Sequence, residues 1–277
     1  MPDPGALADA RLRQFRDHGW TTLPRMFTAR EIAAMRAEID RLHAAGRFRN
    51  LIDAEAADRG EGGVNLQICP LAPHSRLFRA LPFQRRVIAA VGALIGEPLV
   101  CILDQVFVKP PGDGAGTDWH QDNAYFGDSD PTRGTGLWIA IHDATLENGT
   151  MHVVSGSHRE PQRHRRDERS TMLIHAEVDE ARAVPVELQA GDALCFNFGV
   201  LHCTKRNRSR YARAGLALHF AQEAHLPPFD PAQRVVLSGT RASGGKLEHG
   251  EDLSGAWAQE VERALASTAS PPAGAAR

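Results

Sequence analysis

Hydrophobic side chains recur at helical spacing in the first third of the chain. Residues 32–42 place an apolar side chain at nearly every third or fourth position, which predicts a helix. Thr28 and Glu31 stand before this run and fit a capping box, in which two side chains satisfy backbone groups at a helix start. A second helix is predicted within residues 82–96, and the short apolar stretch at residues 20–27 predicts a strand.

The pattern changes after residue 98, where short apolar segments alternate with turn-forming sequences such as PPGDGAG and DSDPTRG. Strands are predicted at residues 99–109, 119–126, 136–143, 150–155, 184–188, 193–198 and 214–220. Short strands without intervening helices are typical of two packed antiparallel sheets. We therefore predict a mainly β protein with flanking helices. Its core is a double-stranded β-helix of the jelly-roll or cupin-like kind, with the N-terminal helices packed on one sheet.

The same boundaries suggest one domain over residues 1–266. We expect a helical N-terminal part at about 1–97, the jelly-roll core at about 98–223, and a C-terminal extension at about 224–266. Residues 53–63 are rich in Ala, Asp, Glu and Gly and predict a mobile loop. The Ala/Pro/Ser/Gly-rich residues 267–277 predict a disordered tail.

Composition narrows the class of protein. A chain of 277 residues with 42% hydrophobic content can bury a sizeable core. Its net charge of −2 argues against nucleic-acid binding, and without an apolar run of 18 residues no membrane span is expected. The four cysteines form no CxxC pair and predict reduced thiols. We expect a soluble, cytoplasmic protein that is a monomer or homodimer.

Two side chains of the metal-ligand type are spaced to share one ion. His120 and Asp122 stand at i and i+2, which on a strand places both on one face. The spacing is weak evidence alone, because roughly one or two such pairs are expected by chance in this composition. The chain has two others, His175 with Glu177 and His249 with Glu251.

Sequence context favours the first pair, because His120 lies in an apolar, strand-like segment and the other two lie in charged surroundings. His202 follows another apolar segment and can supply a third ligand from a neighbouring strand. Two imidazoles and one carboxylate on one side of an ion suit iron(II) chemistry with a chelating cosubstrate and O2. The alternative is that these histidines are ordinary polar residues at strand ends.

Longer segments around these residues are more specific. They are VKPPG, WHQDNAYF, TGLWIAIHDATLENGTMHVVSGSH, QAGDALCFNFGVLHCTKRN and RAGLALHF. Together they resemble the phytanoyl-CoA dioxygenase family of iron(II)/2-oxoglutarate oxygenases, over residues 15–223. The resemblance implies bound Fe(II), 2-oxoglutarate as cosubstrate, and O2. SGSH at residues 155–158 departs from the family's usual PGSH, which affects a turn and not the metal site.

The resemblance also implies roles for single residues. His120, Asp122 and His202 match the iron ligands. Arg213 matches the arginine that pairs with the distal carboxylate of 2-oxoglutarate, and it opens an apolar strand where a buried charge needs a partner. The further cosubstrate-binding positions are Thr204, Trp138 and Gln105, with Gln67 less clearly aligned. The positions expected to approach the substrate are Asn123 and Tyr125.

The retained carboxylate of Asp122 bears on the reaction. Related halogenases have a small residue there, so the resemblance implies hydroxylation or another oxidation over halogenation. The sequence thus predicts a dioxygenase that hydroxylates a small metabolite or natural product and releases succinate and CO2. Two alternatives stay open at this point: a cupin-like metal enzyme that does not use 2-oxoglutarate, and a catalytically inactive binding module.

Overall fold

The computed structural model describes residues 7–52, 63–166, 174–228 and 234–269. The predicted mobile loop, apart from residue 63, lies outside these ranges, as do residues 270–277 of the predicted tail. Within the described part, no helix combines the length and apolar character needed to cross a bilayer.

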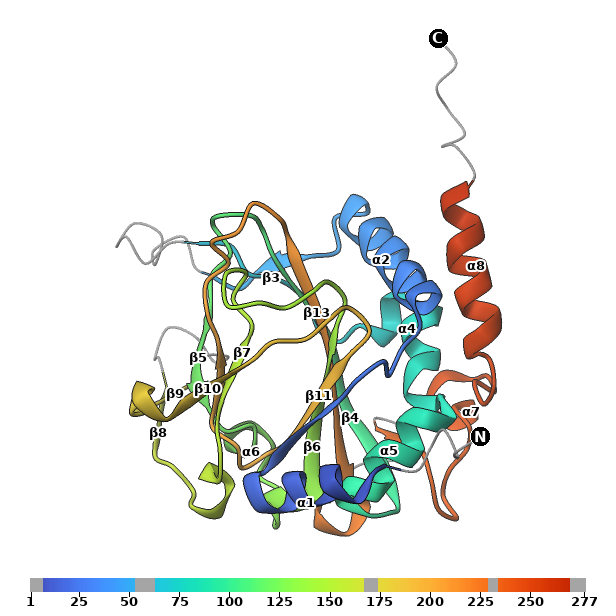
Figure 1. The fold of residues 1–277 in the computed structure, drawn as a ribbon. Coiled ribbons are helices and arrows are strands. Elements are labelled where there is room, and N and C mark those ends of the chain that lie inside the picture. Colours follow the sequence, from blue (N-terminus) through green and yellow to red (C-terminus); the bar gives the residue numbers. More distant parts are fainter. Residues whose placement is uncertain (1–6, 53–62, 167–173, 229–233, 270–277) are drawn as a thin grey trace.

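Two antiparallel sheets form the body of the molecule (Figure 1). The larger has the order β1-β11-β6-β13-β4-β3-β2, with β14 also paired to β4, and the smaller has the order β10-β7-β12-β5. The larger sheet comprises β1 (Trp20–Leu23), β2 (Arg49–Asn50), β3 (Leu66–Ile68), β4 (Leu99–Lys109), β6 (Gly134–Ala140), β11 (Ala193–Asn197), β13 (Arg213–Gln222) and β14 (Val235–Val236). The smaller comprises β5 (Thr117–His120), β7 (Met151–Val154), β10 (Ala183–Val186) and β12 (His202–Thr204). A separate pair consists of β8 (His164–Arg166) and β9 (Ile174–Ala176).

Helices α2 (Ala29–Ala44), α4 (Arg76–Ala80), α5 (Arg85–Ile95) and α8 (Trp257–Ala269) lie on the outer side of the larger sheet (Figure 1). Helix α1 (Asp9–His18) runs across the lower end of the molecule in this view and contacts β1 and α5, and α7 (Lys246–His249) is a single turn. The predicted capping box is present, since the Thr28 side chain accepts from the backbone N–H of Glu31 and Glu31 accepts from that of Thr28. The prediction of a mainly β fold with helices on one sheet is confirmed.

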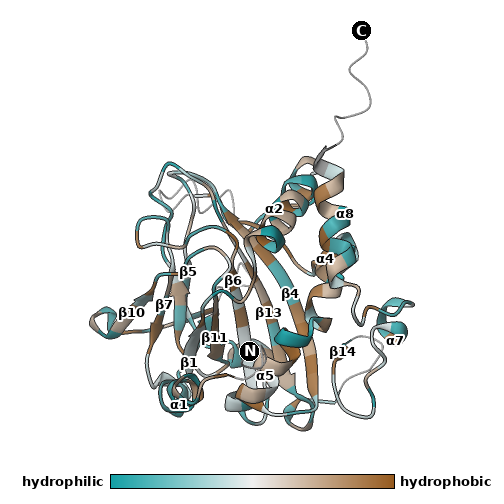
Figure 2. Cartoon of the chain, turned by 45° about the vertical axis from the view of Figure 1, so that its right-hand side comes forward, coloured by the Kyte–Doolittle hydropathy of each residue, from teal (hydrophilic) through white to brown (hydrophobic). Residues whose placement is uncertain are grey.

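Strand β13 shows how the sequence assigns the two faces of the larger sheet. Its alternate residues Leu216, Leu218 and Phe220 join the core cluster shared with the helices. The residues between them face the other sheet and include Arg213 and His219. Figure 2 shows hydrophobic residues along β4 and β13 beside α5. The helix-facing side of the sheet is therefore apolar, and the polar side chains of the strand lie between the two sheets.

One sequence prediction of structure was wrong. The strand expected over residues 119–126 ends at His120, and the helical turn α6 (Asn123–Phe126) follows because Asp122 takes right-handed helical backbone angles (φ −57°, ψ −32°). His202 starts the short strand β12, whose bounds were not among the predicted strands. Residues 267–269, which the sequence assigned to a disordered tail, are the last residues of α8, whose Trp257 and Val261 bury its apolar face against the core.

Candidate active site

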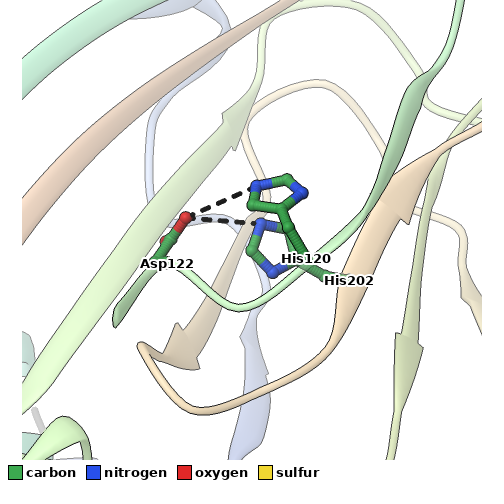
Figure 3. A group of neighbouring side chains, drawn as sticks. All are labelled: His120, Asp122 and His202. Atoms are coloured by element: carbon green, nitrogen blue, oxygen red, sulfur yellow. Dashed lines mark ion pairs between the residues drawn. The ribbon is translucent and has the colours of Figure 1, made fainter. Parts of the chain in front are cut away.

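Three metal-ligand side chains meet between the two sheets. His120 is the last residue of β5 and His202 the first of β12, and these two residues are direct partners in the antiparallel pairing. Their ring centroids lie 4.2 Å apart, and the Nε2 atom of each lies 3.6 Å from Asp122 Oδ1. One donor atom from each residue falls within 4.8 Å of the others (Figure 3). The group is compact enough to share one ion.

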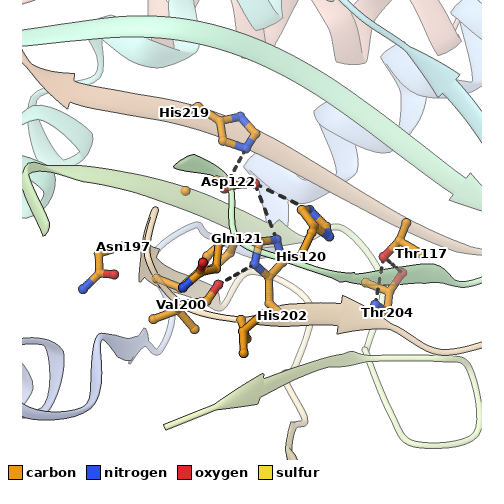
Figure 4. Close-up of polar contacts among 12 residues, drawn as sticks. Thr117, His120, Gln121, Asp122, Asn197, Val200, His202, Thr204 and His219 are labelled. Carbon is orange, nitrogen blue, oxygen red and sulfur yellow. Dashed lines mark hydrogen bonds and ion pairs between the residues drawn. The ribbon is translucent and has the colours of Figure 1, made fainter. Parts of the chain in front are cut away.

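Both histidines are oriented by their other ring nitrogen. His120 Nδ1 lies 2.8 Å from the Asp118 carbonyl oxygen. His202 Nδ1 lies 3.0 Å from the Val200 carbonyl oxygen (Figure 4). A carbonyl only accepts, so each Nδ1 carries the proton and each Nε2 presents a lone pair toward Asp122. Burial, together with the charge of His120, lowers the pKa of His202 to about 4, so its ring is neutral at neutral pH. A neutral imidazole is the form that binds a metal.

Asp122 is buried, with 4% of its surface exposed. Burial opposes its ionisation, but the neighbouring imidazoles of His202 and His219 hold the pKa of its carboxyl well below the usual range. His219 Nε2 lies 3.4 Å from Asp122 Oδ2. Gln121 lies between the two ligand-type residues His120 and Asp122 in the chain. Its Nε2 donates to the Gly199 carbonyl at 2.6 Å, which holds this segment against the turn that precedes β12. Two imidazoles and an ionised carboxylate make a donor set that fits iron(II).

Arg213 is a charged residue of the larger sheet that faces the same cavity. It is 1% exposed, and its guanidinium carbon lies 5.4 Å from the ring centroid of Trp138. Its Nη2 donates to the Gly149 carbonyl, whereas its Nε has no hydrogen-bond partner within the described residues. Burial lowers its pKa to about 10, so the group is still a cation at neutral pH. A buried cation with an unused donor fits an anionic ligand.

The shape of this region depends on Gly215, which lies two residues after Arg213 on β13 and faces the Trp138 ring of the neighbouring strand β6. A Cβ atom at position 215 would lie 2.4 Å from the Trp138 ring. Any larger residue would therefore displace the indole from beneath the guanidinium. Trp138, which the sequence resemblance placed at the cosubstrate, supports Arg213 directly.

The remaining predicted cosubstrate positions lie in the same cavity. Thr204 Oγ1 is 2.9 Å from Thr117 Oγ1. Gln105 accepts a 2.8 Å hydrogen bond from Gln67, whose own oxygen accepts from Arg49 at 2.8 Å. The cavity is lined by Asn65, Gln105, Phe107, Lys109, Thr117, His120, Asp122, Trp138, Met151, Phe196, His202, Thr204, Arg213, Ala217 and His219. A larger surface hollow of about 610 Å³, between α1 and α5, contains none of the three ligand-type residues.

The two predicted substrate positions lie outside this lining. The side chain of Asn123 bonds the backbone N–H of Asp128 at 2.8 Å and so closes the turn after α6. Tyr125 places its ring edge-on to His120, with centroids 5.8 Å apart, and is 39% exposed. Of the two, Tyr125 is the one that contacts a ligand-type residue.

The histidines of the two other His-x-acid pairs do not line this cavity. His175 pairs with Asp118 at 2.8 Å and is half-buried, and His249 packs edge-on to Phe83. Among the cavity residues that the sequence analysis did not single out, Lys109 and His219 carry ionisable side chains. Both stand in the segments that carry the family resemblance, VKPPG and RAGLALHF, but only the strand pairing shows that they face the site.

Two imidazoles and one carboxylate between the sheets of a double-stranded β-helix define a class of protein, the mononuclear non-haem iron(II) oxygenases. The sequence profile described as phytanoyl-CoA dioxygenase matches residues 15–215. The chain belongs to the phytanoyl-CoA dioxygenase family, and its cofactors are iron(II), 2-oxoglutarate and O2.

Similar proteins agree with this membership. Phytanoyl-CoA dioxygenase 1 of Oryza sativa subsp. japonica is 29% identical over 255 residues, which cover 79% of this chain and 90% of the relative. The ectoine dioxygenase of Nocardia farcinica (strain IFM 10152) is 24% identical over 260 residues, covering 86% of each chain. The crystal structure of EvdO2 from Micromonospora carbonacea var. aurantiaca complexed with 2-oxoglutarate is 26% identical, with a TM-score of 0.62, covering 82% of this chain and 98% of that one. The predicted fold and oxygenase class are confirmed, and both alternatives are disfavoured.

Proposed function

We propose that this chain hydroxylates a small metabolite, with His120, Asp122 and His202 holding iron(II) and Arg213 holding 2-oxoglutarate. The observation that carries the proposal is the convergence of three donor atoms within 4.8 Å, with both Nδ1 atoms already bonded to carbonyls. When bound, the metal and its 2-oxo acid activate O2, and the cosubstrate leaves as succinate and CO2. Three protein ligands leave the remaining metal positions to cosubstrate and O2.

The residues of the chain position these groups and exclude water. The two histidines present neutral nitrogen lone pairs, and Asp122 supplies one negative charge to the metal. Arg213 binds the distal carboxylate of the cosubstrate through its planar guanidinium, which Trp138 holds from below. Thr204 and Gln105 add hydrogen-bonding groups to the same cavity. The retained Asp122 carboxylate fills the position that a halide needs, which favours hydroxylation.

The substrate is proposed to be a free small metabolite or natural product. The ectoine dioxygenase among the relatives supports this size class, because its name gives a small substrate. Tyr125 and Asn123, on α6 beside the metal ligands, are the proposed substrate side. The four cysteines are free, which fits the reducing cytoplasm as its compartment. Whether the chain is a monomer or a homodimer stays a prediction.

The experiment that tests the metal site is an anaerobic titration with iron(II) and 2-oxoglutarate. Their complex in a site of this kind gives a weak visible charge-transfer band, and we expect the band with the unaltered protein. His120→Ala removes one of three ligands and should abolish it. An unchanged band in that variant would place the metal elsewhere.

The substrate class is tested separately by screening small metabolites for stimulated succinate release. Arg213→Ala is the matched variant, because it removes the proposed cosubstrate anchor and leaves the three metal ligands in place. We expect succinate formation to fall at least about 100-fold, in line with losing a buried charge-assisted contact. Undiminished succinate formation would remove the arginine from the proposal.

A further inference from the structure

The strand pair β8–β9 lies against the segment that carries two of the three ligand-type residues (Figure 1). Strands β8 and β9 pair in antiparallel register, and β9 contacts β5, the strand that ends at His120. His164 is the first residue of β8 and is half-buried. It lies outside the lining of the cavity between the sheets, so any effect on the site must pass through another residue.

The side chain of His164 bonds the backbone between the two ligand-type residues. Gln121, which separates His120 from Asp122, donates its backbone N–H to His164 Nε2 at 2.9 Å. Because β5 ends at His120, this N–H lies beyond the end of the strand ladder. A nitrogen that accepts a hydrogen bond is unprotonated, so Nε2 acts as the acceptor of a neutral imidazole. His164 thus supplies the acceptor that a neighbouring strand would otherwise provide.

The peptide unit that His164 holds includes part of the first ligand residue. A peptide bond is planar, and the plane that contains the N–H of Gln121 also contains the Cα of His120. Rotation of this plane would carry the imidazole with it and redirect the chain as it enters Asp122. His120 Nε2 and Asp122 Oδ1 are 3.6 Å apart, so the spacing of two donor atoms depends on this one peptide.

The side chain of Gln121 is held by the same part of the chain. Its Oε1 accepts from the backbone N–H of Gln162 at 2.8 Å, and its Nε2 donates to the Glu160 carbonyl at 3.2 Å. Gln121 is 4% exposed, so water has little access to it. Without the His164 acceptor, the N–H of a buried residue would lose its partner, and the segment could recover a hydrogen bond only by moving.

We propose that His164 is a positioning residue for the metal site. By accepting from the Gln121 N–H, it holds His120 and Asp122 at the spacing that one shared ion requires. This role rests on the proposed function, because it concerns the same iron(II) site. The role belongs to the acceptor atom Nε2, so a side chain that keeps an acceptor there should keep the role.

The test compares iron(II) affinity in variants with and without the acceptor, by anaerobic titration of the metal-free protein. His164→Phe keeps a ring but no acceptor, and we expect the dissociation constant to rise about 10- to 100-fold, the usual loss for an outer partner of a metal ligand. His164→Gln keeps an acceptor oxygen and should stay within about threefold of the unaltered protein. At saturating metal, the charge-transfer band of the 2-oxoglutarate complex should shift in the phenylalanine variant and not in the glutamine variant.

A second histidine of the same strand pair provides the matched control. His175 on β9 contacts β5 through an ion pair with the side chain of Asp118, not through the backbone between the ligands. His175→Phe should leave the iron(II) affinity within about threefold, as expected for a partly exposed ion pair. Melting curves without metal report folding separately, because a purely structural role would lower the melting temperature and leave the affinity of the folded protein unchanged. If His164→Phe does not fold, His164→Leu takes its place in the same comparison.

Weaker iron(II) binding in His164→Phe with recovery in His164→Gln supports the proposal. Unchanged binding in the phenylalanine variant would overturn it, and so would a glutamine variant that is equally weak, since the ring and not the acceptor would then matter. An equal loss in His175→Phe would assign the effect to the strand pair as a whole and would also overturn it. If the unaltered protein binds no iron(II), the proposed function itself fails. If it binds iron(II) and only the variants disagree, the positioning role alone fails.

Discussion

At the scale of single residues, His219 decides how Asp122 meets the metal. Asp122 directs Oδ1 toward both ligand histidines and Oδ2 toward His219 Nε2, at 3.4 Å. The His219 ring packs against Phe126 and Phe198, with centroid distances of 5.3 Å and 6.2 Å. Asp122 Oδ2 has no hydrogen-bond partner among the described residues, so the approach of His219 Nε2 is a close polar contact and not a hydrogen bond. The loss of a polar partner that orients a metal-binding carboxylate typically weakens metal binding about 10- to 100-fold.

We therefore expect His219→Phe to weaken iron(II) binding about 10- to 100-fold. The measurement is an anaerobic metal titration, with the affinity for 2-oxoglutarate determined separately at saturating metal. His219→Gln retains a donor and should recover part of the metal affinity. If the phenylalanine variant binds iron(II) as well as the unaltered protein, Asp122 needs no orienting partner.

Some residues of the candidate site could be predicted from the sequence and others could not, for a physical reason. His120, Asp122 and Arg213 stand in local contexts that mark them, a ligand spacing in one case and a charge opening an apolar strand in the other. Lys109 and His219 have no such mark, because their importance comes from pairing across strands. His219 also sits at a register shift in the pairing of β13 with β4, and no periodicity in the sequence encodes that shift.

At the scale of elements, one carboxylate connects three helices. Glu31, in the first turn of α2, accepts hydrogen bonds from Thr28 N at 2.8 Å and from Trp257 Nε1 of α8 at 2.5 Å. It also forms an ion pair with Arg86 of α5. Burial opposes the ionisation of Glu31, but these hydrogen bonds and the charge of Arg86 hold its pKa below the ordinary value of 4.5.

Glu31→Gln should lower the free energy of unfolding by about 1–3 kcal/mol at pH 7, because it removes a buried charge-assisted contact. A carboxyl group whose pKa is lowered in the folded state stabilises the fold at pH values above its ordinary pKa. This contribution is lost as the pH falls through the pKa of the folded state. The difference between the two proteins should thus shrink below about pH 4.5. Denaturant unfolding at several pH values measures it.

The matched control is Glu262→Gln on α8, which removes an exposed ion pair with Arg30 and should change stability by less than about 0.5 kcal/mol. A Glu31 variant whose loss of stability is constant across that pH range would show that the charge of the carboxylate is irrelevant.

The capping box at the start of α2 could be predicted from the sequence, because its signal is local. Helix α8 was not predicted, although Trp257, Val261 and Ala264 recur at helical spacing and pack its apolar face on the core beside α2 and α4.

At the scale of the whole molecule, the site joins the two sheets. His120 and His202 come from the smaller sheet, whereas Arg213 and Lys109 come from the larger one. Metal alone would chiefly engage the first pair with Asp122. A cosubstrate that binds the metal at one end and Arg213 at the other would connect the sheets. Ligands that bind only the folded state stabilise it by mass action, so this bridge has a measurable consequence.

We expect iron(II) and 2-oxoglutarate together, under anaerobic conditions, to raise the melting temperature more than the sum of their separate effects. At 100 times its dissociation constant, a ligand contributes about 2.7 kcal/mol, or roughly 5–10 °C for a chain of this size. Arg213→Met should keep the increment from the metal and lose most of that from the cosubstrate. An equal rise with 2-oxoglutarate in the absence of metal would mean that it binds the larger sheet alone. The two sheets would then be stabilised independently, and the metal would be no part of the connection between them.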